Sequence, residues 1–329
     1  MKVYPEELQA YQNYISEHQD DYQFKLEDSQ LEKIKEYSKQ KLKWLSHNKT
    51  LANMIGLLTL ITIFVIDYFI LTSGYGFLIV FLHGLMIYGF SNYTLHEGAG
   101  HNRIYTKKGL IQTIINNLSR IYFNDPQFYK SAHPRHHSKL ATAEDGAYTQ
   151  FVWPKRFFTS LLPMAFLMPF CDYKIHVGSV YTKSRLLSDI IGLSYNILIL
   201  LLLLEDFNLP IAILIILGSY HIAFYLDRLR ETTEHNLMID TQYGSRNMGS
   251  TVIGMIVGGG PWGQPFHLSH HLEPALPWYF QISMHSFLKK VLTKEQREYY
   301  MIETSWDYFK LLKRVVSINI KEAKKIIHA

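Results

Sequence analysis

The hydrophobic residues of this chain are concentrated in two long blocks that charged segments separate. The first block, Leu51–Leu95, contains no Lys, Arg or Glu, and its one acid is Asp67. A helix needs about 20 apolar residues, each rising about 1.5 Å, to cross a bilayer. The block is therefore long enough for two membrane-spanning helices, and the stretch Ser73–Gly76, with two glycines, predicts the turn between them.

The second block, Leu186–Leu226, has the same organisation. Polar residues and a proline interrupt it near its middle: Glu205, Asp206, Asn208 and Pro210. It predicts two more spans joined by a short turn. A third apolar stretch, Phe157–Phe170, is shorter and contains two prolines, so it predicts an interfacial or re-entrant piece. The pattern favours an all-α integral membrane protein with four transmembrane helices in two hairpins plus interfacial helices.

The basic residues are distributed unevenly around these blocks. They precede the first block (Lys33, Lys35, Lys39, Lys41, Lys43, Lys49), lie between the blocks (Lys107, Lys108, Arg120, Lys130, Arg135, Lys155, Arg156) and follow the second (Arg228, Arg230). Neither predicted turn contains Lys or Arg. Because Lys and Arg concentrate in cytoplasmic loops, both termini and the central segment are expected in the cytoplasm, at the plasma membrane if the source is bacterial. This cytoplasmic excess of Lys and Arg explains the net charge of +5, so no nucleic-acid partner is expected.

The composition limits the redox chemistry that the chain can carry by itself. Cys171 is the one cysteine, which excludes an intrachain disulfide and any cysteine-based zinc or iron–sulfur site. The first 49 residues are polar, so no cleavable signal peptide is expected. We predict three segments: a cytoplasmic N-terminal extension (residues 1–49), a membrane domain (50–285) and a cytoplasmic helical tail (286–329).

One acid and two histidines inside the predicted spans are candidates for a specific role. Asp67 lies near the first turn, and we expect its side chain to reach the far interface, although an acid inside a membrane is also a functional candidate. His83 and His221 are expected to pack or to form hydrogen bonds within the bundle. Axial ligation of a haem by this pair is the alternative.

Histidine is the residue that carries chemistry in this sequence. Of sixteen histidines, nine form a pattern: His96, His101, His133, His136, His137, His235, His267, His270 and His271. Two groups have the form His-x-x-His-His, and residues i, i+3 and i+4 share one face of a helix. His96 and His101 follow directly on the second predicted span and His235 follows the fourth, so all nine are expected on or just beyond the cytoplasmic membrane face. They predict a cytoplasmic helical cap that carries the histidines.

The number of histidines indicates more than one metal ion. Imidazole binds iron, zinc, copper and nickel, and nine imidazoles exceed the needs of one tetrahedral zinc. Two ions with open coordination positions fit better. The step from His96 to His101 is five residues, or about 500° on an α-helix, so we expect this pair to need a helix end or to serve both ions.

These histidine groups, their order and the two-hairpin layout resemble the membrane fatty acid desaturase family, which also contains carotenoid ketolases and relatives of alkane hydroxylases. The resemblance covers roughly residues 51–285. The run His270–Tyr279 looks most like the third histidine group of bacterial members and carotenoid ketolases, and Arg230–His235 resembles a stretch of bacterial desaturases. Glu231 stands where acyl-CoA desaturases have an Asn, and this departure weakens the expectation of an acyl-CoA substrate.

The resemblance implies that the nine histidines bind two ferrous ions and that O₂ is a co-substrate. The implied activity is an O₂-dependent desaturase that introduces a double bond into a fatty acyl or related lipid chain. The alternative is a hydroxylase or ketolase of a lipid, alkane or carotenoid at the same site. A divalent metal transporter is a remote alternative. Transporters bind their ions near the membrane midplane, where this chain is expected to have only His83 and His221.

The resemblance also implies an external electron donor of the ferredoxin, rubredoxin or cytochrome b5 type. Its docking face would include four basic residues: Arg135, Lys139, Lys155 and Arg156. Contact with lipid head groups explains these basic residues equally well. Metal-bound histidines usually donate their second N–H to a carboxylate or carbonyl. The acids expected in this role are Glu97, Asp145, Glu231 and Glu234. The run Gly258–Gly260 predicts a bend before the third histidine group.

Overall fold

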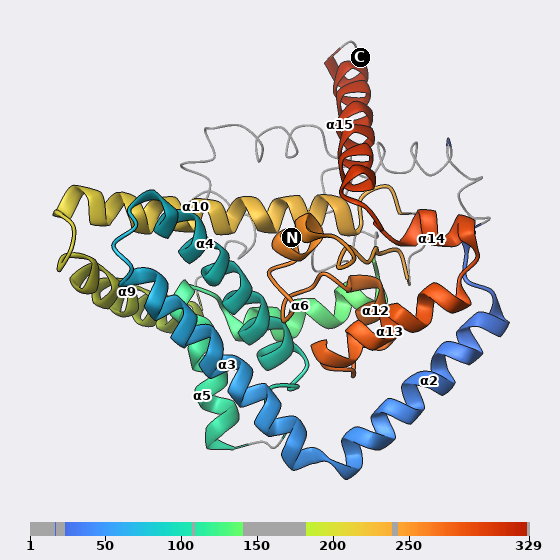
Figure 1. Ribbon diagram of the computed structural model, residues 1–329, viewed down its shortest axis with the longest axis horizontal. Helices are drawn as coiled ribbons and strands as arrows, with labels where there is room; N and C mark the ends of the chain where they lie inside the picture. The colour runs from blue at the N-terminus through green and yellow to red at the C-terminus, as the bar shows by residue number, and fades with distance from the viewer. Residues whose placement is uncertain (1–16, 18–23, 107–108, 141–181, 239–242, 328–329) are drawn as a thin grey trace. The chain divides into compact units, whose positions relative to one another are not determined.

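The computed structural model describes residues 17, 24–106, 109–140, 182–238 and 243–327. Within these ranges the chain is helical and has no strand, although two isolated bridges join Asn247 to Phe266 and to Met301. Four of the described helices are long and apolar enough to cross a membrane (Figure 1). They are α3 (Lys49–Leu71), α4 (Phe77–Asn92) with its extension η2 (Tyr93–Gly100), α9 (Lys183–Leu203) and α10 (Leu209–Glu234). The helical class and the number of apolar spans are therefore confirmed.

The chain divides into two compact units, and each is described separately. Unit 1 comprises residues 1–42, 131–165 and 228–329, and unit 2 comprises residues 43–130 and 166–227. The division into 1–49, 50–285 and 286–329 stays a prediction. The apolar stretch Phe157–Phe170 lies outside the described residues, as do Asp145, Lys155, Arg156 and Cys171.

Unit 2 contains most of the four apolar helices. Residues 72–76 connect α3 to α4 as expected, and Gly74 and Gly76 there adopt positive φ angles of 70° and 51°. The two helices pack against each other. Buried apolar side chains from the ends of all four helices form one cluster: Leu71, Ile79, Ile199, Leu203, Ala212 and Ile215.

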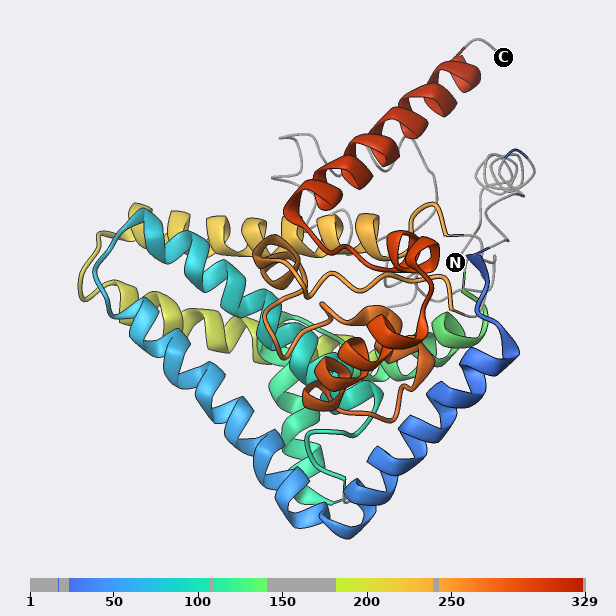
Figure 2. The same cartoon turned by 45° about the vertical axis from the view of Figure 1, so that its right-hand side comes forward.

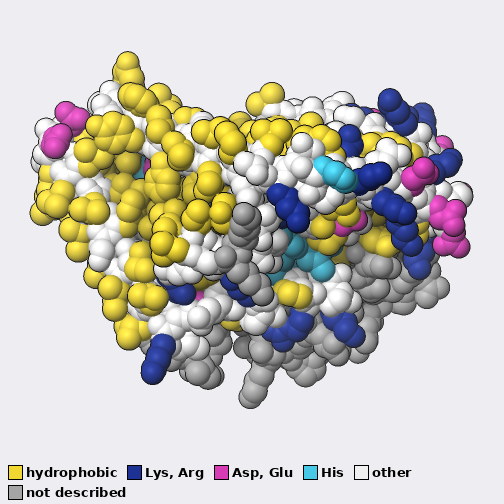
Figure 3. Space-filling view, turned by 90° about the horizontal axis from the view of Figure 1, so that it is seen from below, with side chains coloured by type: hydrophobic (Ala, Val, Ile, Leu, Met, Phe, Trp, Pro, Cys, Tyr) yellow, Lys and Arg dark blue, Asp and Glu magenta, His cyan; other side chains and the backbone are white. Residues whose placement is uncertain are grey.

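The outer faces of these helices are strongly hydrophobic. Phe69 of α3 is 65% exposed, and Leu198 of α9 and Leu214 of α10 are each 63% exposed. Figure 3 shows hydrophobic side chains gathered over a broad part of the visible surface. Soluble monomers rarely leave so much contiguous apolar surface in contact with water. The exposed faces are those expected of helices that contact lipid.

Asp67 does not reach the interface as predicted. Its side chain is buried: His83 Nδ1 donates to Asp67 Oδ1 at 2.7 Å, and the Tyr122 hydroxyl donates to Oδ2 at 3.2 Å. A carboxylate in an apolar bundle is stabilised by such partners rather than by a distant water layer. The prediction for Asp67 was wrong, and the hydrogen bond expected of His83 within the bundle is confirmed.

The segment after η2 folds against the apolar helices of unit 2. It forms α5 (Leu110–Leu118) and the short η3 (Ser119–Tyr122), which contacts α9. Arg120 is buried and donates from Nη1 to Ser184 O and Ser188 Oγ, both at 2.6 Å. These bonds hold η3, and with it Tyr122, beside the start of α9.

Unit 1 contains the greater part of α2 and α6 and five further described helices (Figures 1 and 2). In chain order they are α2 (Asp28–His47), α6 (Pro126–Ser138), α11 (Val252–Val257), α12 (His267–Leu272), α13 (Trp278–Val291), α14 (Lys294–Tyr300) and α15 (Ser305–Ile327). Gln30 of α2 donates to Gln296 of α14 at 2.7 Å, and Tyr37 stacks on Phe287 of α13 with ring centroids 4.3 Å apart. The bend predicted at Gly258–Gly260 is present, with φ angles of 83° and 79° at its last two residues.

Candidate metal centre

Four buried histidines of unit 1 converge on one point. They come from α6 (His136), from the residue after α10 (His235) and from α12 (His267 and His271). One ring nitrogen from each lies within 4.8 Å of the others. Four imidazoles at this spacing form a nitrogen-rich site of the size that one transition-metal ion occupies.

The two His-x-x-His-His groups lie on helices, as predicted. In each group the rings of the i and i+4 histidines point toward each other. His267 Nε2 lies 3.1 Å from His271 Nε2 on α12, and His133 Nε2 lies 3.1 Å from His137 Nε2 on α6. Two nitrogens that each sit about 2.1 Å from one ion, at right angles, are about 3 Å apart. The spacing is therefore that of neighbouring ligands on a metal.

His235 gives the clearest test of whether a metal fits. Its Nδ1 donates to the carbonyl oxygen of Gly244 at 2.8 Å, which leaves the lone pair on Nε2. That Nε2 is buried and has no hydrogen-bond partner among the residues that the structure describes. A histidine fixed by a backbone carbonyl on one nitrogen, with a buried lone pair on the other, is the usual arrangement of a metal ligand.

The electrostatics of the cluster also favour ligation. Burial, followed by the neighbouring imidazoles, lowers the pKa of His235, His267 and His271 well below the ordinary value. These rings are therefore neutral at pH 7, because the interior disfavours their charged form. A neutral imidazole is the form that binds a metal.

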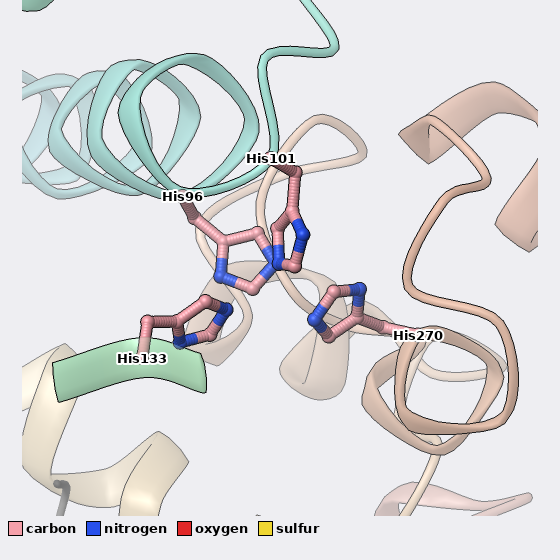
Figure 4. A group of neighbouring side chains, drawn as sticks. All are labelled: His96, His101, His133 and His270. Carbon is pink, nitrogen blue, oxygen red and sulfur yellow. The ribbon is translucent and has the colours of Figure 1, made fainter. Parts of the chain in front are cut away.

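The other predicted ligands form two groups. His133, His137 and His270 belong to unit 1, where His270 Nε2 lies 2.8 Å from His137 Nε2 and the rings of His133 and His270 stack at 5.9 Å. His96 and His101 belong to unit 2, with ring centroids 4.9 Å apart. Figure 4 shows both pairs of rings. Seven of the nine predicted ligands thus lie together in unit 1, and the remaining two lie together in unit 2.

The π-helical turn η2 explains why His96 and His101 approach each other. The N–H of His101 donates to the carbonyl of His96 at 3.1 Å, which is the i+5 to i bond of a π-turn. The π-turn brings residues five apart closer than an α-helix would, and His101 directly follows the last residue of η2, so the helix end expected for this pair is confirmed. His96 Nδ1 is also hydrogen bonded to the hydroxyl of Tyr129 at 2.9 Å, a partner that the sequence did not reveal.

The predicted acids have different partners. Glu97 pairs with Arg103 and Glu231 pairs with Arg228, each at 2.5 Å. Glu234 is fully buried, with Oε2 at 3.6 Å from His267 Nε2 and 3.2 Å from Arg230 Nη1. Glu234 therefore lies beside a histidine of the four-histidine cluster, where it also balances the buried charge of Arg230.

The site can bind a transition-metal ion through imidazole nitrogens, with a buried carboxylate beside them. Its interpretation depends on these residues, because comparisons with family models, with curated proteins and with solved structures find no match to this chain.

Proposed function

We propose that this chain is an integral membrane di-iron oxygenase that desaturates a fatty acyl or related lipid chain. The observation that supports it most is the convergence of four buried imidazoles, within 4.8 Å of one another, on helices of unit 1. Bound iron would supply the O₂-dependent oxidation of an unactivated C–H bond. The family resemblance of the histidine groups supplies the reaction class.

The nine histidines divide naturally between two ions in this proposal. His136, His235, His267 and His271 hold the first ion. His133, His137 and His270 hold the second, and the family resemblance counts His96 and His101 among the nine ligands. Arg230 and Glu234 carry opposite charges beside the first ion, so the protein contributes little net charge there.

The apolar helices provide the environment for a lipid substrate. His235 follows directly on α10, which is long and apolar enough to span a membrane. In the proposal, the four spans form two hairpins, both termini and the histidine cap face the cytoplasm, and a bacterial host would place the protein in its plasma membrane. A substrate chain would then enter from the lipid while its polar end stays in water. The chain's task is to hold one carbon near the site and to exclude bulk water.

The proposed reaction needs electrons from a partner. Desaturation removes two hydrogen atoms from adjacent carbons, and O₂ takes these with two electrons and two protons to give two water molecules. The single cysteine is too few for an iron–sulfur or rubredoxin centre within the chain. A ferredoxin, rubredoxin or cytochrome b5-type donor would therefore be required. Arg135 and Lys139 are exposed on and just beyond α6, beside the histidines, and suit an acidic donor.

Lipid analysis tests the reaction class. The wild-type chain and His136→Ala would be expressed in the same host, and the lipids compared by mass spectrometry. A product lighter than its precursor by two hydrogens supports desaturation, whereas one heavier by an oxygen atom means hydroxylation. Identical lipid profiles for the wild type and His136→Ala would contradict both.

Metal analysis of the detergent-purified protein separates an oxygenase from a transporter. We expect two tightly bound irons per chain and loss of iron in His136→Ala. Readily exchangeable zinc in place of iron would favour the transporter, and no bound metal would contradict the proposal.

A further inference from the structure

The helix that carries the third histidine group is too short to fix its own direction. α12 has six residues, and its N-cap residue, Phe266, makes no side-chain capping bond. Isolated helices of this length are not stable. The rotation of α12 about its axis, and with it the direction of three imidazoles, must be set by contacts with other parts of unit 1.

Asn247 supplies the missing cap from a distant position in the sequence. Its Oδ1 accepts the backbone N–H of Ser269, the third residue of α12, at 3.1 Å. This N–H is the one that an N-cap side chain ordinarily satisfies. Asn247 Nδ2 also donates to Ser269 Oγ at 2.9 Å. Both ends of the Asn247 side-chain amide therefore bind Ser269, the residue directly before His270.

The backbone of Asn247 is itself fixed on both sides. Its N–H donates to the carbonyl of Tyr300 at 2.9 Å, and its carbonyl accepts from the N–H of Ile302 at 2.8 Å. The next residue, Met248, donates to the carbonyl of Pro265 at 2.6 Å. Asn247 is fully buried. It therefore anchors α12 to the segment that links α14 and α15.

His285 completes this arrangement and must be in one tautomer. A backbone N–H can only donate, so the bond from Ser269 identifies Oδ1 of Asn247 and leaves Nδ2 as a donor. Nδ2 lies 3.0 Å from His285 Nδ1, which must then accept. His285 Nε2 consequently carries the proton and donates to Ser250 Oγ at 2.8 Å. The ring of His285 is neutral in this network, and it is buried.

We propose that Asn247 and His285 are positioning residues of the metal centre: they clamp Ser269 and so fix the direction of His267, His270 and His271. A shift of α12 by one residue would turn these side chains by about 100°. The role of this clamp in holding metal ligands rests on the proposed function. The hydrogen bonds that form the clamp do not depend on a bound metal.

Three variants separate the clamp from ordinary packing. Asn247→Ala removes the cap on α12, and His285→Leu keeps the volume but removes the acceptor for Asn247. His285→Gln is the matched control, because its amide oxygen can accept from Asn247 while its NH₂ group donates to Ser250. If His285 only filled space, His285→Leu would preserve the structure of α12 better than His285→Gln.

Hydrogen exchange of the metal-free protein tests the clamp directly. We expect faster exchange in the peptide that spans residues 266–272 for Asn247→Ala and His285→Leu, and wild-type exchange for His285→Gln. Peptides of α9, in unit 2, should keep wild-type protection in all three. Unchanged exchange at α12 in Asn247→Ala would overturn the proposal, as would a His285→Gln variant that behaves like His285→Leu.

Binding of Co²⁺, in place of iron, tests the consequence for the metal centre. Loss of groups that orient metal ligands typically lowers affinity 10- to 100-fold, so we expect about this loss for Asn247→Ala and His285→Leu, with an altered ligand-field spectrum. His285→Gln should remain within about threefold of the wild type. Wild-type Co²⁺ affinity in Asn247→Ala would overturn the positioning role. If the wild type bound no metal while α12 exchange rose in Asn247→Ala, the clamp would stand and the proposed function would fall.

Discussion

The histidine cluster depends, at the scale of single residues, on which ring nitrogen holds the proton. The Gly244 carbonyl assigns the proton of His235 to Nδ1, and the amide of Asn247 assigns that of His285 to Nε2. One of these rings presents a lone pair to a metal site, whereas the other supports the helix that carries further ligands. Both assignments come from a fixed backbone or amide group, so they survive side-chain motion better than a water-mediated contact would.

Replacement of His235 tests the ligand assignment with little disturbance elsewhere. We expect His235→Ala to lower the affinity for the first ion by about 100-fold or more, because it deletes a buried lone pair that no other group replaces. Equilibrium dialysis against a metal buffer measures the change. His47→Ala, at an exposed histidine near the end of α2, should bind metal like the wild type. Equal affinities for the two variants would remove His235 from the site.

His285 gives the metal-free protein a pH dependence of known sign. Burial lowers its pKa from 6.5 to about 4. Below pH 6.5 the unfolded chain therefore binds a proton that the folded chain does not, and the stability falls as the pH drops toward 4. The loss from this residue is at most about 1.4 kcal/mol per pH unit. Thermal denaturation between pH 7 and pH 5 measures it.

The control for this effect is His285→Gln, which keeps the hydrogen bonds but cannot titrate. Its melting temperature should decline less between pH 7 and pH 5 than that of the wild type. A decline of the same size would show that other groups account for the acid sensitivity. Metal must be absent, because a bound ion competes with protons for the cluster.

At the scale of helices, the sequence predicted the elements well and their mutual contacts poorly. Apolar block lengths, the turn at residues 72–76 and the i, i+4 pairing of His267 with His271 follow from local patterns. The π-turn at His96 does not, because no local signal distinguishes it from an α-helix. Asn247 and Tyr129 were missed for a related reason: each touches a partner more than 20 residues away, and only the folded chain brings them together.

Asp67 is the clearest example of a contact that changes the interpretation of an element. The acid lies on α3, its partner His83 on α4, and Tyr122 on η3. One carboxylate thus ties three elements of unit 2 together inside an apolar bundle. The segment after the second span, which the charge pattern assigns wholly to the cytoplasm, sends the Tyr122 side chain into this network.

We expect Asp67→Ala to destabilise unit 2 strongly. Removal of one partner from a buried polar network leaves the others unsatisfied and costs about 3–5 kcal/mol. The melting temperature of the purified protein in one detergent should fall accordingly. The matched variant Asp206→Ala, at an exposed turn residue, should melt like the wild type. A small effect of Asp67→Ala, similar to that of Asp206→Ala, would mean that the network contributes no stability.

At the scale of the whole molecule, the orientation in the membrane is a prediction from the charge pattern. The connections between α3 and α4 and between α9 and α10 contain no Lys or Arg, whereas the segments at the other helix ends are rich in both. By the positive-inside rule, this pattern predicts both connections outside the cytoplasm. The proposed function needs the nine histidines on the opposite, cytoplasmic side, where the proposed electron donor would reach them.

Accessibility of single cysteines tests this orientation. In a Cys171→Ser background, Tyr75→Cys and Asp206→Cys report on the two connections, and Lys43→Cys reports on the segment before α3; all three positions are exposed. An impermeant maleimide should label the first two in intact cells and Lys43→Cys only after lysis. Labelling of Lys43→Cys in intact cells would invert the topology, and labelling of only one connection would break the two-hairpin arrangement. The second outcome would also separate the histidine groups across the bilayer, which no shared metal centre could tolerate.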